Sequence, residues 1–153
     1  MDQIEDQPAE QGSLLLQDQL CFVLYAASRA VTARYRPLLD ELGLTYPQYL
    51  VMLVLWDQDG VTVREVGTAL QLESSTLSPL LKRLEAGGLI RRERRADDER
   101  SVSVHLTEQG RALRERATAV PVAIGAAMGL TPDDFREAKR ILRQLTANVS
   151  AGA

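Results

Sequence analysis

The strongest constraint on the fold lies in residues 61–106, where two short helical patterns are followed by two alternating runs. The first pattern, VREVGTAL, begins after Thr62, which can cap it, and the second, STLSPLLKRLEA, stops at Gly87 and Gly88. A turn at about 71–74 separates them. The runs LIRRERR and SVSVHL then alternate like strands on either side of the polar turn ADDER. We therefore expect a helix-turn-helix followed by a β-hairpin in the position of a wing.

Further helical patterns flank this stretch. Upstream, Ser13 can cap a helix that begins LLLQDQL and ends at Gly43, and Thr45 can cap the helix of YPQYLVMLVLW. Downstream, one helical segment begins at Thr107, and a last helix begins at Thr131 with a proline in its first position. The expected fold class is mainly α with a small β-hairpin wing (α+β).

Composition limits the class of protein. The chain has 153 residues, of which 45% are hydrophobic, and this fits one domain, residues 13–153, around one core. The start MDQIEDQPAEQG is acidic and lacks the basic end and apolar run of a signal peptide, so we expect a disordered tail over residues 1–12. The longest apolar runs fall short of the ~20 residues that span a bilayer. This predicts a soluble, cytoplasmic protein with no membrane partner.

Cysteine and histidine each occur once in the chain. One cysteine cannot form a disulfide within the chain, and one cysteine with one histidine does not make the ligand set of a structural zinc. We therefore expect no metal and no cofactor.

Charge is distributed unevenly. The net charge of −3 argues mildly against nucleic-acid binding, because DNA-binding domains usually carry a basic surface. Residues 64–100, however, contain eight basic and seven acidic side chains, and the basic ones concentrate in the expected hairpin. A charged run is usually a solvated face. Its position directly after a helix-turn-helix makes DNA contact the better interpretation.

Candidate DNA contacts come from the second helix and from the hairpin. Small hydroxyl side chains at a helix start can contact base edges or phosphates, although capping of the helix explains them equally well. Basic side chains two turns later suit phosphates, and an arginine near the hairpin tip can reach a narrow minor groove. The candidates are Ser74, Ser75, Thr76, Ser78, Lys82, Arg83, Arg94, Arg95, Asp98 and Arg100.

From about Leu14 onward the chain resembles the MarR family of winged-helix transcriptional regulators. The stretches that carry the resemblance are LTYPQYLVMLVLW and SSTLSPLLKRLEAGGLIRRERRADDERSVSVHLTEQG. Its most specific part is Asp98-x-Arg100, followed by the dipeptide Leu-Thr at 106–107. The resemblance implies that Asp98 braces the wing, that Arg100 enters the minor groove of operator DNA, and that the protein is not an enzyme.

The same resemblance implies how the chain is divided. It implies a homodimer joined through the first and last helices, residues 13–44 and 107–150. Between them lies the winged helix-turn-helix, residues 45–106, with its wing at about 89–106. The expected architecture is thus a DNA-binding unit carried by N- and C-terminal dimerisation helices.

Within that family, LCFVLYAASRAVTARYRPLLDELGLTYPQYLVM resembles the organic-hydroperoxide-sensing OhrR branch. The resemblance implies a redox-sensing Cys21 with Tyr25, Tyr35 and Tyr46. Cys21 and Tyr25 are four residues apart and share a helix face. Tyr35 follows 14 residues after Cys21, about 21 Å further along a continuous helix, so it cannot reach the cysteine of its own chain. The resemblance implies that two such helices cross in the dimer and supply Tyr35 and Tyr46 from the partner subunit.

A phenol that donates to sulfur favours the thiolate, which attacks a peroxide to give a sulfenic acid. Apolar neighbours such as Leu16 and Phe22 favour an organic hydroperoxide over hydrogen peroxide. Since no second cysteine is present, a small cellular thiol must form the mixed disulfide. The expected function is a repressor that releases operator DNA when Cys21 is oxidised.

Two other functions are compatible with parts of the sequence. A lone cysteine in an apolar helix is most often inert packing, and the chain would then be a MarR-type repressor released by a non-covalent phenolic or aromatic ligand. A thiol peroxidase would use the same cysteine for turnover, but the chain lacks a thioredoxin-like βαβ pattern, and the wing would have no role. We expect Tyr49 and Trp56 to be core residues and His105 to be structural.

Overall fold

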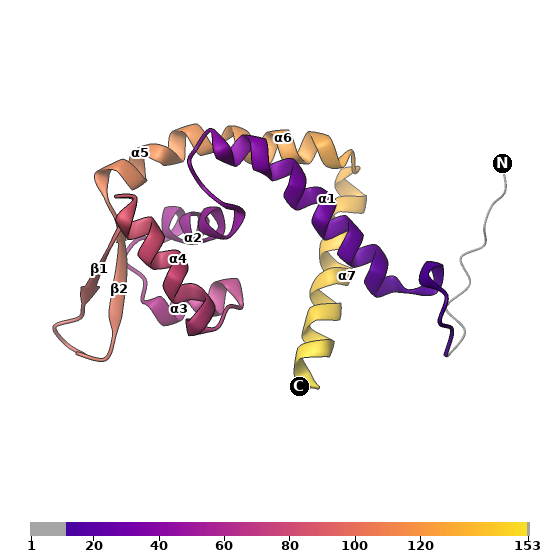
Figure 1. The fold of residues 1–153 in the computed structure, drawn as a ribbon, viewed down its shortest axis with the longest axis horizontal. Coiled ribbons are helices and arrows are strands. Elements are labelled where there is room, and N and C mark those ends of the chain that lie inside the picture. Colours follow the sequence, from indigo (N-terminus) through magenta and orange to yellow (C-terminus); the bar gives the residue numbers. More distant parts are fainter. Residues whose placement is uncertain (1–11, 153) are drawn as a thin grey trace.

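The structure is a computed structural model that describes residues 12–152, so the expected tail lies outside the described residues except for Gly12. Figure 1 shows the winged-helix part at one end, the arch of α5 and α6 with α1 beside it, and α7 turning away at the other end. The elements are η1 (Leu16–Asp18), α1 (Leu20–Asp40), α2 (Tyr46–Asp57), α3 (Val63–Leu70), α4 (Ser74–Ala86), β1 (Ile90–Arg94), β2 (Val102–Leu106), α5 (Glu108–Ala117), α6 (Ala119–Met128) and α7 (Pro132–Ala151).

The predicted fold class is confirmed. Helices α3 and α4 form the helix-turn-helix, with Gln71 in the left-handed conformation (φ 55°) between them. Strands β1 and β2 pair antiparallel, from Ile90 opposite Leu106 to Arg94 opposite Val102. The segment before α3 adds to β2, because hydrogen bonds join it to both backbone groups of Val104, at 3.1 and 2.8 Å. The wing is therefore fixed at its base to the helical core.

The helix starts follow local capping rules. Thr45 and Thr62 each form a capping box, with Gln48 and Glu65 respectively, in which side chain and backbone satisfy each other's donors. The hydroxyls of the threonines before α5 and α7 accept from the N–H three residues later. These four predicted caps are confirmed.

The predicted Ser13 cap is wrong. Its hydroxyl donates to the carboxylate of Asp18 and accepts from the N–H of Leu15, so it closes a local turn instead of capping a helix. A 3-10 turn, η1, follows, and α1 begins only after Gln19, whose side chain does not cap it.

The single helical segment predicted from Thr107 is also wrong, because it is two helices, α5 and α6, joined at Thr118. Pro121, in the first turn of α6, has no N–H to donate to the carbonyl of Ala117, and this interrupts the helical ladder. The hydroxyl of Thr118 instead donates to the Glu115 carbonyl at 2.7 Å.

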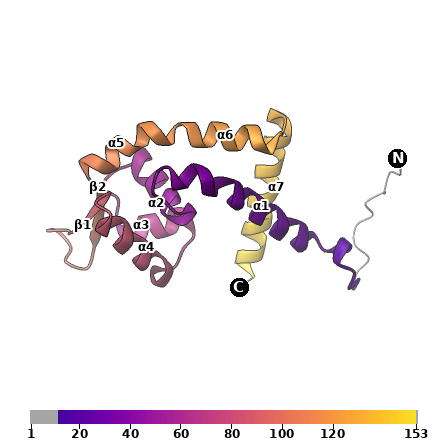
Figure 2. The same cartoon turned by 45° about the horizontal axis from the view of Figure 1, so that its top comes forward.

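The core lies under the winged-helix part. It is built from the end of α1, from α2, α3 and α4, from the base of the wing, and from α5 and α6. Tyr49 is buried and Trp56 half-buried, as predicted, and the Trp56 indole donates to the Gly110 carbonyl at 2.9 Å. Helix α7 contributes no buried residue, and Figures 1 and 2 both show it standing away from the winged-helix part. Within residues 12–152 no helix is both long and apolar enough to cross a membrane.

Candidate sensor site and nucleic-acid interface

Cys21 lies in the first turn of α1 and is exposed. Tyr25, one turn later, is 60% exposed, and Phe22 beside the cysteine is 43% exposed. The guanidinium of Arg29, one further turn on, lies over the Tyr25 ring, 5.5 Å from its centroid. The N-terminal half of α1 thus presents a thiol, a phenol and apolar side chains that remain exposed among the described residues 12–152.

Tyr35 and Tyr46 lie elsewhere, at the buried end of α1. Their ring centroids are 4.7 Å apart, and the Tyr49 ring, one turn further along α2, lies 5.8 Å from that of Tyr35. Because α1 is continuous from Leu20 to Asp40, Tyr35 lies about 21 Å along the axis from Cys21. One chain therefore brings the four predicted sensor residues together only as two separate pairs.

The phenol of Tyr35 is held in its protonated form. Burial raises the pKa of Tyr35 above its usual value, and the neighbouring phenols of Tyr46 and Tyr49 raise it further. The pKa of Tyr49 is likewise raised by burial and then by Tyr46. The phenol of Tyr35 therefore keeps its proton to a higher pH than an exposed tyrosine does.

Helix α4 presents the predicted DNA-contacting hydroxyls on its exposed side. Leu77, Leu81 and Leu84 are buried on the opposite side. The helix begins after Glu73, and no side chain caps it, so capping does not account for the serines in its first turn. The exposed candidates on this helix are Ser74, Ser75, Thr76, Ser78, Lys82 and Arg83.

The tip of the wing is ordered by Asp98. Its carboxylate accepts from the N–H of Arg100 at 3.0 Å, and its carbonyl accepts from the N–H of Ser101 at 3.0 Å. Arg95 forms a two-pronged pair with Asp97, both bonds at 3.1 Å, which lowers the pKa of that carboxyl. Within residues 12–152 neither Arg94 nor Arg100 is in an ion pair.

A groove of about 880 Å³ separates α4 from the wing. Its lining includes Arg64, Ser74, Ser78, Arg92 and Arg100. Hydroxyl and guanidinium groups from α3, α4 and the wing therefore line one open groove, an arrangement suited to phosphates and base edges.

Comparison with known proteins decides the family. A family model described as transcriptional regulator SarA/Rot matches residues 33–116. The organic hydroperoxide resistance transcriptional regulator of Bacillus subtilis (strain 168) is 48% identical over 126 residues, which cover 82% of this chain and 84% of the relative. The chain belongs to the MarR/SarA-type winged-helix regulators, in the OhrR branch. It is thus a relative of transcription regulators, and DNA binding is the role of its winged helix.

Two further comparisons agree with membership of this family of regulators. The transcriptional regulator MgrA of Staphylococcus aureus is 41% identical over 128 residues, covering 83% of this chain and 87% of the relative. Reduced AbfR, solved bound to DNA, is 37% identical with a TM-score of 0.75, covering 89% of this chain and 93% of that one. AbfR is from Staphylococcus epidermidis and has also been solved with a disulfide formed.

One set of contacts in the structure, around Leu106, has no signal in the sequence. Asp59 accepts the N–H of Leu106, at the end of the wing, at 2.8 Å, and Arg111 donates to the carbonyl of the same residue at 3.1 Å. Asp59 and Arg111 themselves are 3.5 Å apart. This clamp ties the end of α2, strand β2 and helix α5 together. Asp59 is 47 residues from Leu106, so no local pattern predicts their contact.

The base of the wing also holds a polar cluster around His105. Its Nε2 lies 3.0 Å from the Ser103 hydroxyl and 3.6 Å from the Glu93 carboxylate. Both partners contact the same ring nitrogen, so the three groups do not form a proton relay of the serine-hydrolase type. Within residues 12–152 no three His, Cys, Asp or Glu side chains gather to hold a metal ion.

Proposed function

We propose that this regulator is a repressor that senses organic hydroperoxides through oxidation of Cys21. The observation that carries the proposal is the division of the sensor residues along one continuous helix. The exposed Cys21 and Tyr25 lie at one end of α1, and the paired Tyr35 and Tyr46 lie at the other. Two copies are needed to complete a site.

A homodimer through the first and last helices supplies the second copy. Helix α7 carries exposed apolar side chains, and so does the N-terminal half of α1. Apolar faces of this extent are normally covered, because they lose contact with water on association. If residues 13–44 and 107–150 form the interface and the α1 helices cross antiparallel, each Cys21 meets Tyr35 and Tyr46 of the partner subunit. The exposed apolar residues on α7 are Phe135, Ile141, Leu142 and Val149.

The completed site can react with a peroxide. Hydrogen bonds from the phenols favour a thiolate at Cys21, which attacks the terminal oxygen of the hydroperoxide. The O–O bond breaks, sulfur takes the OH to become a sulfenic acid, and the alkoxide leaves with a proton as the alcohol. Phe22 and its apolar neighbours favour an organic substituent on the peroxide.

A second reaction follows because Cys21 is the one cysteine among 153 residues. A small thiol attacks the sulfenic sulfur and forms a mixed disulfide, with loss of water. The added group cannot fit between the phenols that held the thiolate. Further oxidation to the sulfinic acid is the irreversible alternative.

These changes are large enough to release DNA. A hydrogen bond to a charged group contributes ~1.5–3 kcal/mol, and a typical allosteric coupling is ~1–3 kcal/mol, about 5- to 150-fold in affinity. The two recognition helices of a dimer must match half-sites ~34 Å apart, so a small rotation of the subunits spoils both contacts.

A DNA-binding assay tests the proposal. Reduced protein is titrated onto operator DNA with and without cumene hydroperoxide and a small thiol, in parallel with Cys21→Ser. We expect the wild type to lose affinity and the variant to keep it. Equal release of both proteins would contradict the proposal and support a non-covalent ligand instead. Continuous consumption of peroxide with excess thiol would point to a peroxidase.

A further inference from the structure

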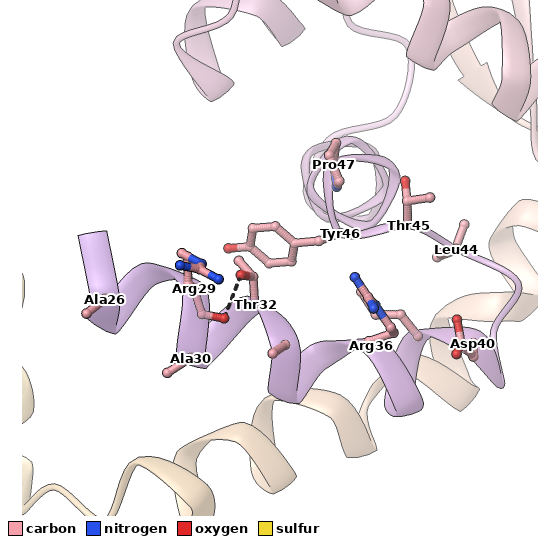
Figure 3. A pocket seen from close by; sticks show the side chains of 12 residues that line it. Ala26, Arg29, Ala30, Thr32, Arg36, Asp40, Leu44, Thr45, Tyr46 and Pro47 are labelled. Carbon is pink, nitrogen blue, oxygen red and sulfur yellow. Dashed lines mark hydrogen bonds between the residues drawn. The ribbon is translucent and has the colours of Figure 1, made fainter. Parts of the chain in front are cut away.

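A groove of about 780 Å³ runs between α1 and the start of α2 (Figure 3). Its wall is formed by small and apolar side chains, including Ala26, Ala30 and Leu44. Two guanidinium groups, those of Arg29 and Arg36, stand on the α1 side. In one chain this space is in the range that holds small ligands, and its mixture of apolar wall and charge suits an amphipathic one. In the proposed dimer a ligand shares the groove with Cys21 of the partner subunit.

The groove carries an excess of positive charge. Arg29 and Arg36 are seven residues apart, two turns on one face of α1 and about 10 Å along the axis. Neither is in an ion pair with any residue in the described range 12–152. Asp40 is the one acid among the lining residues. The hydroxyl of Thr32 is occupied, since it donates to the Ser28 carbonyl at 2.8 Å.

The groove adjoins half of the sensor site. Figure 3 shows the Tyr46 side chain reaching from α2 toward α1, with its hydroxyl directed to the Arg29 side and Arg36 beyond the other end of the ring. The same ring packs on Tyr35, 4.7 Å between centroids. In the proposed dimer these phenols receive Cys21 of the partner subunit. A molecule held by the two arginines is therefore beside the oxidised sulfur.

We infer that this groove binds the carboxylate of the amino-acid-derived thiol that converts the Cys21 sulfenic acid into a mixed disulfide. The inference rests on the proposed function. The chain holds no second cysteine, so the thiol comes from outside, and a thiol that keeps the free carboxyl group of its parent amino acid carries a carboxylate. Guanidinium groups bind carboxylates through paired, charge-assisted hydrogen bonds. The apolar surroundings of Cys21 suit the peroxide, and the arginines suit the thiol.

The reaction in the groove is balanced without another reagent. The thiol sulfur attacks the sulfenic sulfur, the S–O bond breaks, and the oxygen leaves as water with the thiol proton. The thiol sulfur is oxidised and the sulfenic sulfur reduced as the S–S bond forms. The arginines take no part in the bond changes. They hold the carboxylate so that the thiol is presented to the site at raised local concentration.

Two thiols that differ in charge test the inference. Purified dimer is converted to the sulfenic acid with one equivalent of cumene hydroperoxide, and mixed-disulfide formation is then followed by mass spectrometry. The thiols are N-acetylcysteine, which has a carboxylate, and N-acetylcysteine amide, which has none. Each rate in a variant is divided by the wild-type rate for the same thiol, so the intrinsic reactivity of the thiol cancels.

Arg36→Gln is expected to slow N-acetylcysteine about tenfold and to leave its amide unchanged, as expected for loss of one charge-assisted bond. Arg29→Gln should show the same difference. Arg34→Gln is the matched control, because Arg34 borders a different pocket, between α1 and α6, and should alter neither rate. Circular dichroism of Arg36→Gln should match that of the wild type, which shows that the variant is folded.

Three results would overturn the inference. Unchanged N-acetylcysteine rates, or equal slowing of both thiols, would show that the arginines do not recognise the carboxylate. Release of DNA from Cys21→Ser by N-acetylcysteine would make the groove a reversible ligand site. Absence of any sulfenic acid in the wild type would instead defeat the proposed function, and the inference with it.

Discussion

At the scale of single residues, the phenol of Tyr35 is the proposed donor to Cys21 of the partner subunit, and burial raises the pKa of that phenol above its usual value. Tyr35→Phe keeps the ring that packs on Tyr46 and removes only the hydroxyl. We expect the dimer to fold normally and Cys21 to react with cumene hydroperoxide about tenfold more slowly at neutral pH, because one hydrogen bond to the thiolate is lost. Stopped-flow measurement of sulfenic acid formation gives the rate.

Mixed dimers show whether Tyr35 acts on Cys21 of its own chain or on Cys21 of the partner subunit. A dimer of one Cys21→Ser chain and one Tyr35→Phe chain keeps a single reactive cysteine, in the Tyr35→Phe chain. That cysteine faces an intact Tyr35 if the site is shared, and it should react at the normal rate. A slow rate there, together with a slow Tyr35→Phe homodimer, would place the tyrosine within the same chain and refute the crossing.

The candidate residues could be predicted to different extents. Cys21 and its tyrosines follow from the likeness of one stretch to the OhrR branch, because their order along the chain is characteristic. Arg29 and Arg36 were missed, since arginines on an exposed helix face are ordinary in sequence. Only the structure shows that both line the groove between α1 and α2.

At the scale of elements, the wing tip carries Arg100 on a loop braced by Asp98. Arg100→Ala is expected to weaken operator binding by ~1–3 kcal/mol, as for removal of a groove contact, without unfolding the dimer. Fluorescence anisotropy at physiological salt measures the affinity, and circular dichroism checks the fold. If Arg100→Ala bound the operator with unaltered affinity, the wing would not be part of the DNA interface.

Lys82, exposed on α4, is expected to contact a phosphate. Lys82→Ala should weaken binding to specific and non-specific DNA alike. The slope of log affinity against log salt should become shallower by about one, because one fewer counterion is released. Titrations at several salt concentrations measure the slope. The same slope in variant and wild type would show that Lys82 does not contact DNA.

The clamp of Asp59 and Arg111 on Leu106 should stabilise the base of the wing. Asp59→Ala leaves the Leu106 N–H without its acceptor and is expected to lower the free energy of unfolding by about 1–2 kcal/mol. Asp57→Ala, an exposed carboxylate near the same helix end, is the control and should change little. Urea denaturation at fixed protein concentration compares them. Equal stability of both variants would show that the clamp is dispensable.

Elements that obey local rules could be predicted, and those that depend on distant partners could not. The threonine caps follow from the identity of a residue and the position three later. The Ser13 cap failed because Asp18 competes for its hydroxyl. The break between α5 and α6 follows from Pro121, a local signal that the sequence contains. The clamp at Leu106 joins three separate elements and has no local signal.

At the scale of the whole molecule, α7 buries none of its own residues and stands away from the winged-helix part. Ile141→Asp places a carboxylate in the proposed interface and is expected to weaken dimerisation by more than about 2 kcal/mol, since the charge would be buried without a partner. Ala147→Asp, an exposed position about 120° around the same helix from Ile141, is the control. Sedimentation velocity over a concentration series measures the dimer fraction. A stable Ile141→Asp dimer would contradict the proposed division of the chain.

The unbroken course of α1 has a genetic consequence. If each Cys21 is activated by Tyr35 of the other chain, the response to peroxide differs according to whether two mutations lie in one gene copy or in two. Consider a cell with one wild-type allele and one allele that carries both Cys21→Ser and Tyr35→Phe. In every mixed dimer the mutant chain has no thiol, and the wild-type chain's Cys21 faces a phenylalanine instead of Tyr35. With the lesions on separate alleles, every mixed dimer retains one intact sensor. Among the mixed dimers, release of DNA by peroxide should therefore be greater when the two mutations lie on separate alleles than when they lie on one. This difference follows from the length of α1, which keeps Cys21 and Tyr35 of one chain apart.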